Sequence, residues 1–379
     1  MLLEGDVLRG RTIASGSVGI RDGLIADDAS GPRHAIPAGW TICAGFVDVQ
    51  VNGFGGAEVG DDPAQLAAVA RALPAAGVTA FCPTLVSRSP AAYERAAAAL
   101  RGARFDRLSA RTLGVHLEGP FLAPTRHGAH DPGVLTAPSP EAVDRMLARF
   151  APAIVTLAPE LPGGLTAVRR LRRAGCVVAV GHTEADAAIG RAAIAAGAGL
   201  LTHALNAMRG LESRDPSALA AFLAHPRARV SLIADGVHVA PEVAAVVARA
   251  AGRRLVLISD AASAAGAPPG TYRLGALTIV SDGRRALAGG RLAGSALGIG
   301  HGPVTLTGAG IPRAAALAAA IDAPRRLLGL PPGLAAGTPA DVVVLDPGLV
   351  PRLTLVAGEV AYADPDLPFP IRTRPRGGA

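Results

Sequence analysis

Four ionisable residues each stand near the end of a short apolar run of this sequence: Glu118 in "TLGVHLEG", His182 in "CVVAVGHT", His203 in "LLTHALN" and Asp260 in "RLVLISDA". A buried carboxylate must be hydrogen-bonded, paired or bound to a cation, because leaving it bare costs far too much free energy. Two imidazoles and one carboxylate form a ligand set typical of catalytic zinc, which keeps a further position open for water. Asp260 would then remain for proton transfer.

Each of these residues also has an ordinary structural interpretation. A histidine can be a hydrogen-bonded core residue, and an acid can cap the helix that follows it. For a single residue this interpretation is as good as a functional one, but four together favour a metal site with an acid or base beside it. His116 lies two residues before Glu118, on the same face of an extended strand, so a contact that supports Glu118 is one interpretation of it, and a core histidine without a functional role is the favoured one.

Short apolar runs alternate with alanine-rich segments from residue 44 onward, and eight such runs can be counted up to residue 261. Strands that alternate with helices of ten or more residues indicate a parallel sheet, and eight of them predict a closed (β/α)8 barrel of the TIM type. The carboxyl ends of barrel strands ring one mouth, where active sites are built. The pattern therefore predicts that the four ionisable residues meet there.

The two ends of the chain differ from its middle. Residues 1–43 and 335–379 carry alternating pieces such as "GSVGIRDGLIAD" and "ADVVVLDP", which lack helical periodicity. We expect both ends to form one small β-sandwich domain, with residues 44–334 as the catalytic barrel domain. The stretch "TYRLGALTIVSDGRRALAGGRLAGS" alternates around "SDG" and predicts a hairpin inserted after the eighth strand.

Composition excludes several classes of function. The 379 residues contain no lysine, which rules out a Walker lysine, a Schiff base and a carboxylated lysine between two metals. The net charge of +7 comes from scattered arginines with few aromatic residues, so no nucleic-acid partner is expected. Charged residues interrupt every apolar stretch, and the start "MLLEGDVLRG" does not resemble a secretory signal, so we expect a cytoplasmic protein without a membrane partner. The three cysteines are predicted to be buried and unpaired.

The motifs "GFVDVQVNGFGG", "HLEGPF", "GAHDP", "GHT", "THALNAM", "ADGVHV", "SDA" and "LAGS" occur in the order seen in N-acetylglucosamine-6-phosphate deacetylases of the amidohydrolase superfamily. This resemblance covers essentially the whole chain. It implies an enzyme of amino-sugar catabolism that uses a metal-activated water. The implied reaction converts N-acetyl-D-glucosamine 6-phosphate into D-glucosamine 6-phosphate and acetate.

The resemblance also implies roles for individual residues. Glu118, His182 and His203 match ligands of one divalent metal ion per subunit, with zinc favoured and iron(II), manganese or cobalt as alternatives. Asp260 matches the acid/base, and His130 matches a residue that polarises the carbonyl. The positions that match the substrate contacts are Ala129, His130, Asn206, Ala207, Arg214, His238, Leu292, Ala293 and Gly294. In that family the arginine at the position of Arg214 reaches the neighbouring subunit's substrate, which implies a functional homodimer.

Two departures from the family pattern bear on the site. Gln50 and Asn52 stand where many amidohydrolases carry two histidines for a second metal, and amides are poor replacements for imidazole. A single metal is therefore expected. Ser217 replaces a glycine that often follows the motif around Arg214.

Two alternatives to the deacetylase remain open from the sequence. One is another amidohydrolase activity, such as a deaminase, a cyclic amidase or a deacetylase of unphosphorylated amino sugars, because one fold hosts many reactions. The other is a catalytically silent homologue that acts as a binding module. The presence of Asp260 together with all three predicted ligands argues against the silent homologue.

Overall fold

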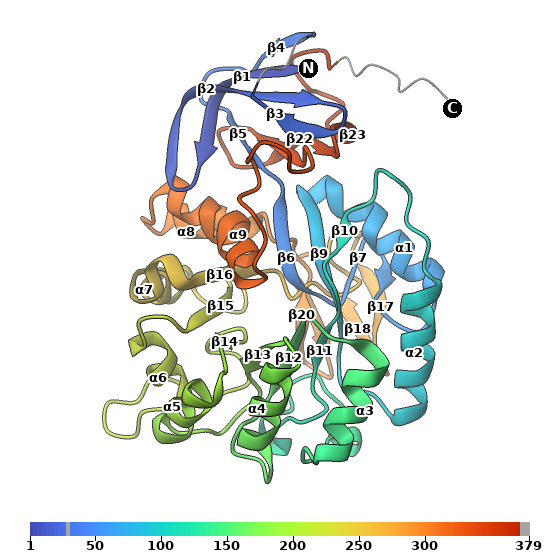
Figure 1. Cartoon of the computed structure of the whole chain (residues 1–379), viewed down its shortest axis with the longest axis vertical. Coiled ribbons are helices and arrows are strands. Elements are labelled where there is room, and N and C mark those ends of the chain that lie inside the picture. The colour runs from blue at the N-terminus through green and yellow to red at the C-terminus, as the bar shows by residue number, and fades with distance from the viewer. Residues whose placement is uncertain (28–30, 372–379) are drawn as a thin grey trace.

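The computed structural model describes residues 1–27 and 31–371. Its centre is a barrel of parallel strands in which each strand pairs with the next along the chain (Figure 1). A bridge between Val51 and Ala261 joins the last strand to the first. The barrel strands are β6 (Phe46–Val51), β9 (Val78–Leu85), β11 (His116–Glu118), β12 (Ile154–Leu157), β13 (Val177–Val180), β14 (Leu200–Leu201), β15 (Arg229–Ile233) and β16 (Leu255–Ile258). The predicted (β/α)8 barrel is confirmed.

Helices surround the barrel on its outside (Figure 1). They are α1 (Pro63–Ala72), α2 (Pro90–Gly102), α3 (Pro140–Phe150), α4 (Gly164–Arg173), α5 (Ala187–Ala196), α6 (Ala218–Ala224), α7 (Pro241–Ala251), α8 (His301–Gly308) and α9 (Arg313–Leu327), with short 3-10 segments at η1 (Leu73–Ala76), η2 (Pro124–Arg126), η3 (Pro132–Val134) and η4 (Gly252–Arg254). Side chains cap several helix starts: Asp62, Ser89 and Asp186 each accept a hydrogen bond from a backbone N–H of the first turn. Proline at the first position of α1 and α2 suits the same boundary.

Small apolar side chains fill the inside of the barrel, among them Val47, Ala80, Ile154 and Val256. Such a packed interior holds the strand ends rigidly, so that residues at the mouth have fixed places. Cys43, Cys82 and Cys176 are buried and unpaired, as predicted.

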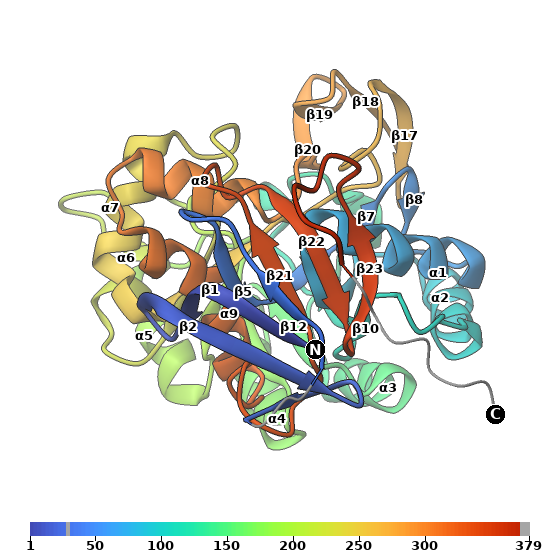
Figure 2. The same cartoon turned by 90° about the horizontal axis from the view of Figure 1, so that it is seen from above.

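Strands from both ends of the chain form the small β-sandwich domain. Its strands are β1 (Leu2–Arg9), β2 (Thr12–Arg21), β3 (Leu24–Ala26), β4 (Arg33–Ala35), β5 (Thr41–Ala44), β21 (Val342–Leu345), β22 (Pro351–Val356) and β23 (Glu359–Ala363). The antiparallel pairing of β5 with β21 joins the two chain ends, which Figure 2 shows side by side. The proposed boundaries at residues 43 and 335 stay a prediction, and residues 372–379 lie outside the described part of the chain.

The segment inserted after β16 is larger than the predicted hairpin. It is a four-stranded antiparallel sheet in the order β17 (Gly270–Leu274), β18 (Leu277–Ser281), β19 (Arg285–Ala288) and β20 (Arg291–Ser295). The "SDG" turn joins β18 to β19 as expected, and Gly289 and Gly290, both with positive φ, form a second tight turn. Leu274 and Ala293 of this sheet pack in one apolar cluster with Val86 at the end of β9. Two further short ladders, β7 (Gly53–Phe54) with β8 (Ala57–Glu58) and β10 (Arg111–Thr112) with β9, lie at the barrel ends.

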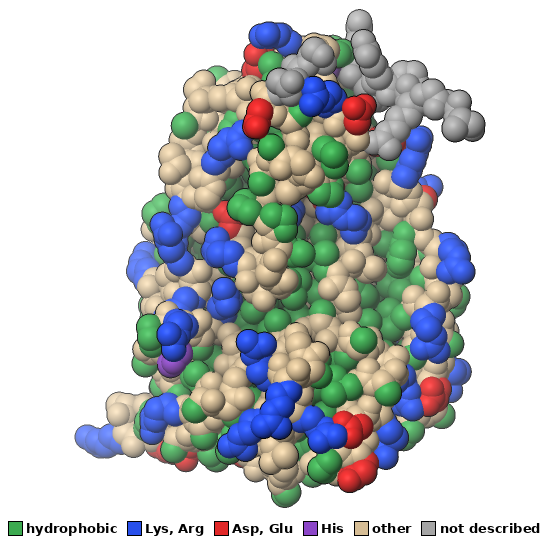
Figure 3. All heavy atoms as spheres, viewed as in Figure 1, with side chains coloured by type: hydrophobic (Ala, Val, Ile, Leu, Met, Phe, Trp, Pro, Cys, Tyr) green, Lys and Arg blue, Asp and Glu red, His purple; other side chains and the backbone are tan. Residues whose placement is uncertain are grey.

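Arginine side chains are spread over the face seen in Figure 3, from the small domain to the helices at the opposite end. Within the described ranges, no helix has the length and apolar character needed to cross a membrane.

An ion pair between Arg111 of β10 and the buried carboxylate of Asp341 links the barrel to the small domain. We expect Arg111→Met to lower the free energy of unfolding by about 2 kcal/mol, because the buried Asp341 carboxylate loses the charged donor of a half-exposed pair. Arg107→Met is the matched control, since Arg107 pairs with Glu359 on the surface and should cost less than about 1 kcal/mol. Denaturant unfolding measures the free energy of unfolding of both variants. Equal decreases in Arg111→Met and Arg107→Met would contradict the stabilising role of the Arg111–Asp341 ion pair.

Candidate active site

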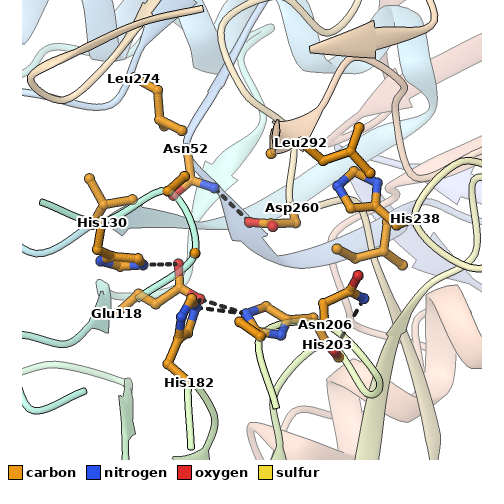
Figure 4. Close-up of a pocket in the computed structure, with 16 residues that line it drawn as sticks. Asn52, Glu118, His130, His182, His203, Asn206, His238, Asp260, Leu274 and Leu292 are labelled. Carbon is orange, nitrogen blue, oxygen red and sulfur yellow. Dashed lines mark hydrogen bonds and ion pairs between the residues drawn. The ribbon is translucent and has the colours of Figure 1, made fainter. Parts of the chain in front are cut away.

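The predicted residues converge on one cavity of about 140 Å³ at the carboxyl ends of the barrel strands (Figure 4). Glu118 is the last residue of β11, whereas His182, His203 and Asp260 follow β13, β14 and β16 by two residues. These last three have φ values of 48°, 29° and 50°. Left-handed backbone costs an ordinary residue roughly 1–3 kcal/mol, and such strain concentrates at functional sites.

Three side-chain atoms form a tight triangle at the base of this cavity. Glu118 Oε1 lies 3.2 Å from His182 Nε2 and 3.0 Å from His203 Nε2, and the two Nε2 atoms are 3.1 Å apart. A tetrahedral zinc site holds its ligand atoms about 3.3 Å apart, so the triangle fits a single cation. His182 Nδ1 lies 2.8 Å from the carbonyl oxygen of Arg126. As the donor in that bond, Nδ1 carries the proton and leaves the Nε2 lone pair free for a metal.

His130 is a third imidazole beside Glu118, and Glu118, His130 and His182 also lie close enough to hold a metal. Its hydrogen bonds argue against that role. The backbone N–H of Ser87 donates to His130 Nδ1 at 3.1 Å, so the proton of the neutral ring is on Nε2. Burial lowers the pKa of His130 to about 4, which keeps the ring neutral at physiological pH. His130 therefore presents an N–H donor to the cavity, not a lone pair.

Asp260 lies above the triangle (Figure 4) and is held by two amides, of which Figure 4 shows that of Asn52. Asn52 Nδ2 donates to Asp260 Oδ1 at 2.7 Å, and Gln50 Nε2 donates to the same oxygen at 3.1 Å. Burial, together with the nearby negative charge of Glu118, raises the pKa of Asp260 to about 6. A carboxyl group with a pKa near neutrality can both take up and release a proton.

His238 faces the cavity from the side opposite His130 (Figure 4). Its Nδ1 lies 2.8 Å from Asp235 Oδ2, which also accepts a hydrogen bond from Ser295 Oγ at 2.8 Å. Although burial opposes ionisation, the His238 side chain and backbone N–H groups hold the pKa of Asp235 well below its usual range. The Asp235 carboxylate thereby orients His238 with Nε2 available to a ligand.

The structure brings most of the predicted substrate contacts to this cavity. Those that line it are Ala129, His130, Asn206, Ala207, His238, Leu292 and Gly294. Ala293 does not line the cavity, because along β20 its side chain points into the apolar cluster behind Leu292 and Gly294. Arg214 is exposed in the loop before α6 and does not line the cavity of its own chain.

Several contacts of the site were not singled out from the sequence. Ser87, Asp235 and Leu274 carry no motif signal of their own, although Asp235 lies within "ADGVHV". His116, weighed from the sequence as a partner of Glu118, hydrogen-bonds to the Val49 carbonyl at 2.9 Å and to Thr156 Oγ1 at 2.8 Å. Ser217, which replaces a glycine, is buried and donates to the carbonyl of Gly210 at 2.7 Å.

Comparisons with known proteins place this arrangement in a family. Residues 41–367 match the amidohydrolase family. An N-acetylglucosamine-6-phosphate deacetylase from Danio rerio is 35% identical over 85% of this chain and 84% of its own length. An N-acetylgalactosamine-6-phosphate deacetylase from Escherichia coli O157:H7 is 36% identical over 89% of this chain and 93% of its own length.

Solved structures agree with the sequence comparisons. A mutant N-acetyl-D-glucosamine-6-phosphate deacetylase from Mycobacterium smegmatis, in complex with N-acetyl-D-glucosamine-6-phosphate, superposes with a TM-score of 0.88 at 36% identity and covers 95% of this chain and 99% of its own. The resemblance inferred from the motifs is thereby confirmed. A family match over residues 41–367, a cluster of side chains that could hold a metal and relatives of this similarity lead to one conclusion: the chain belongs to the amidohydrolase family.

Proposed function

We propose that this protein hydrolyses N-acetyl-D-glucosamine 6-phosphate to D-glucosamine 6-phosphate and acetate. The observation that carries the proposal is the cavity in which Asp260 and His130 flank the triangle of Glu118, His182 and His203. An acetamide resists hydrolysis because water is a weak nucleophile and the amine a poor leaving group. The cavity contains residues that address both obstacles.

Glu118, His182 and His203 would hold one divalent metal ion, with zinc as the favoured metal. When bound, such an ion lowers the pKa of a water molecule and polarises a carbonyl. Their mutual distances of 3.0–3.2 Å and the tautomer of His182 support this assignment.

The protein residues supply the proton transfers. Asp260 takes a proton from the attacking water and returns it to the nitrogen of the leaving amine, so that one carboxyl serves as base and then as acid. His130 donates its Nε2–H to the carbonyl oxygen, where negative charge develops. His238 and Asn206, on the opposite side of the cavity, bind the sugar phosphate together with the backbone around Ala207.

We further propose a homodimer in which Arg214 completes the neighbouring site. A phosphate dianion needs charged donors, yet none of the described residues that line the cavity is an arginine. The Arg214 guanidinium makes no hydrogen bond or ion pair within the described part of its own chain, and it lies on an exposed loop. It is therefore available to a second subunit. The cytoplasmic location expected from the sequence stays a prediction.

The proposed activity is tested by acetate release from N-acetylglucosamine 6-phosphate by metal-replete protein. We expect turnover with the phosphorylated sugar and at least about tenfold lower kcat/KM with the unphosphorylated one, because the phosphate contacts are lost. N-acetylgalactosamine 6-phosphate should be tested in the same assay, since one relative at 36% identity is named a deacetylase of that sugar. Preference for an unphosphorylated sugar or another amide would favour a different amidohydrolase activity, and no turnover at all would favour the silent binding module.

Metal content is expected to approach one equivalent per chain. Gln50 and Asn52 stand at the second position common in amidohydrolases, where amides are poor replacements for imidazole on a transition metal, and both turn their NH2 groups towards Asp260. Elemental analysis of dialysed, zinc-loaded protein measures the ratio. Two equivalents that are both required for turnover would contradict the single site.

Arg214→Met should lower kcat/KM for the phosphorylated sugar by roughly 10-fold to 150-fold, the cost of about 1.5–3 kcal/mol for one charged hydrogen-bonding partner. The unphosphorylated sugar should be hardly affected. Mixing Arg214→Met with Asp260→Asn subunits tests the sharing directly, because a mixed dimer contains one site with both functional residues. With random exchange about half the dimers are mixed, so roughly a quarter of wild-type activity should return at limiting substrate. Activity equal to the average of the two variants would show that Arg214 acts within its own chain.

A further inference from the structure

The amides of Gln50 and Asn52 form hydrogen bonds that the sequence did not predict. Each side chain is almost fully buried, with 1% and 3% of its surface exposed. Gln50 Nε2 donates to Glu118 Oε1 at 2.9 Å as well as to Asp260 Oδ1 at 3.1 Å, so one NH2 group bridges two carboxylates. Like charges repel each other at this range, and the shared donor offsets that repulsion.

Asn52 holds the same carboxylate from a second direction. Its Nδ2 donates to Asp260 Oδ1 at 2.7 Å, and its own backbone N–H donates to the carbonyl of Ala261 at 2.8 Å. The end of β6 is therefore tied both to the side chain of Asp260 and to the residue that follows it. Both amide donors bind the same oxygen, and within the described chain no hydrogen bond reaches Asp260 Oδ2.

We propose that Gln50 and Asn52 are positioning residues that clamp Asp260 by Oδ1 and reserve Oδ2 as the oxygen that transfers the proton. The inference rests on the proposed function, in which Asp260 moves a proton between water and the leaving amine. An oxygen that already accepts two hydrogen bonds has no lone pair directed at the substrate, whereas Oδ2 keeps both. Gln50 thus takes the place of a second cation between Glu118 and Asp260, and Asn52 fixes Asp260 from the other side.

The principal test is Asn52→Leu, which keeps the size of the side chain and removes its donor. Displacement of a reacting group by about 1 Å can cost about 100-fold in rate, so we expect kcat to fall by about 10-fold to 100-fold. KM and the metal content should stay within twofold of wild type, because neither a proposed substrate contact nor a residue of the triangle is replaced. A crystal structure of the variant should show the Asp260 carboxylate turned away from its wild-type position.

Gln50→Met removes the other donor and is compared with Gln65→Met, a matched change outside the cavity. Gln65 lies in α1 and accepts a hydrogen bond from the backbone of Glu58, so its replacement should leave kcat unchanged. Gln50→Met should lower kcat, and it keeps the test informative if Asn52→Leu does not fold. Wild-type kcat in both Gln50→Met and Asn52→Leu would overturn the clamp.

A double variant separates positioning from a merely structural role. In an Asp260→Asn background there is no carboxylate to aim, so adding Asn52→Leu should leave the residual rate unchanged within about twofold. A further large loss would show that Asn52 acts on the fold or the metal and would overturn the inference. Failure of the wild type to release acetate would instead remove the proposed function itself, so the two failures are distinguishable.

Discussion

Asp260→Asn should fold, keep its metal and lose nearly all turnover. The amide preserves the shape of the side chain but cannot accept the proton of the attacking water or return it to the amine. This transfer commonly contributes about 100-fold to 10,000-fold to the rate. Acetate release under saturating substrate measures the loss, and metal analysis of the same preparation shows whether the site is otherwise intact.

The control for this substitution is Asp144→Asn on α3. Asp144 forms an exposed ion pair with Arg170, far from the cavity, and such pairs contribute little to stability or activity. Its turnover should equal that of wild type. If Asp260→Asn lowered turnover by less than about tenfold, Asp260 would not be the proton-transfer residue. Replacing a carboxyl group that carries both proton transfers should slow the reaction by more than that.

The second large effect distinguishes His203 from His130, since either imidazole lies close enough to Glu118 and His182 to be the third metal ligand. His203→Ala should lose the metal on dialysis, since only Glu118 and His182 of the triangle remain. A metal contributes several kcal/mol to transition-state stabilisation, and each ~1.4 kcal/mol is a factor of ten in rate. Turnover should therefore fall by about 1000-fold or more. His182→Ala should behave in the same way.

His130→Ala should keep its metal and still lose activity. Removing one donor to a developing oxyanion typically costs about 100-fold to 1000-fold in kcat, while the triangle of ligands is untouched. Zinc content and kcat measured on the same dialysed samples separate the two variants. Loss of metal from His130→Ala with retention in His203→Ala would reverse the assignment that the Ser87 hydrogen bond supports.

Much of the fold was predictable from the sequence because its signals are local. Apolar runs alternating with helices of about ten residues specify a parallel barrel, and capping residues such as Asp62 and Ser89 mark the helix starts. The insertion after β16 was underestimated, because a strand of four or five residues beside a glycine turn gives little periodicity to count. The extent of β17 and β20 becomes clear only where Leu274 and Ala293 pack on the barrel.

The sequence by itself also determined which chemistry the site could perform. Glu118, His182, His203 and Asp260 lie at the ends of separate strands, and parallel strands in a closed barrel bring those ends to one mouth. Their convergence follows from topology alone. No knowledge of side-chain contacts is needed to predict a metal site with a carboxylate beside it.

Only the tertiary structure decided how the individual side chains divide the work. Whether an imidazole presents a lone pair or an N–H depends on the partner of its other nitrogen. For His130 that partner is Ser87, 43 positions earlier in the chain. The two donors to Asp260 are Gln50 in β6 and Asn52 just after it, more than 200 positions away. Contacts over such separations leave no periodic trace in the sequence, because they arise when strands distant in the chain close into one barrel.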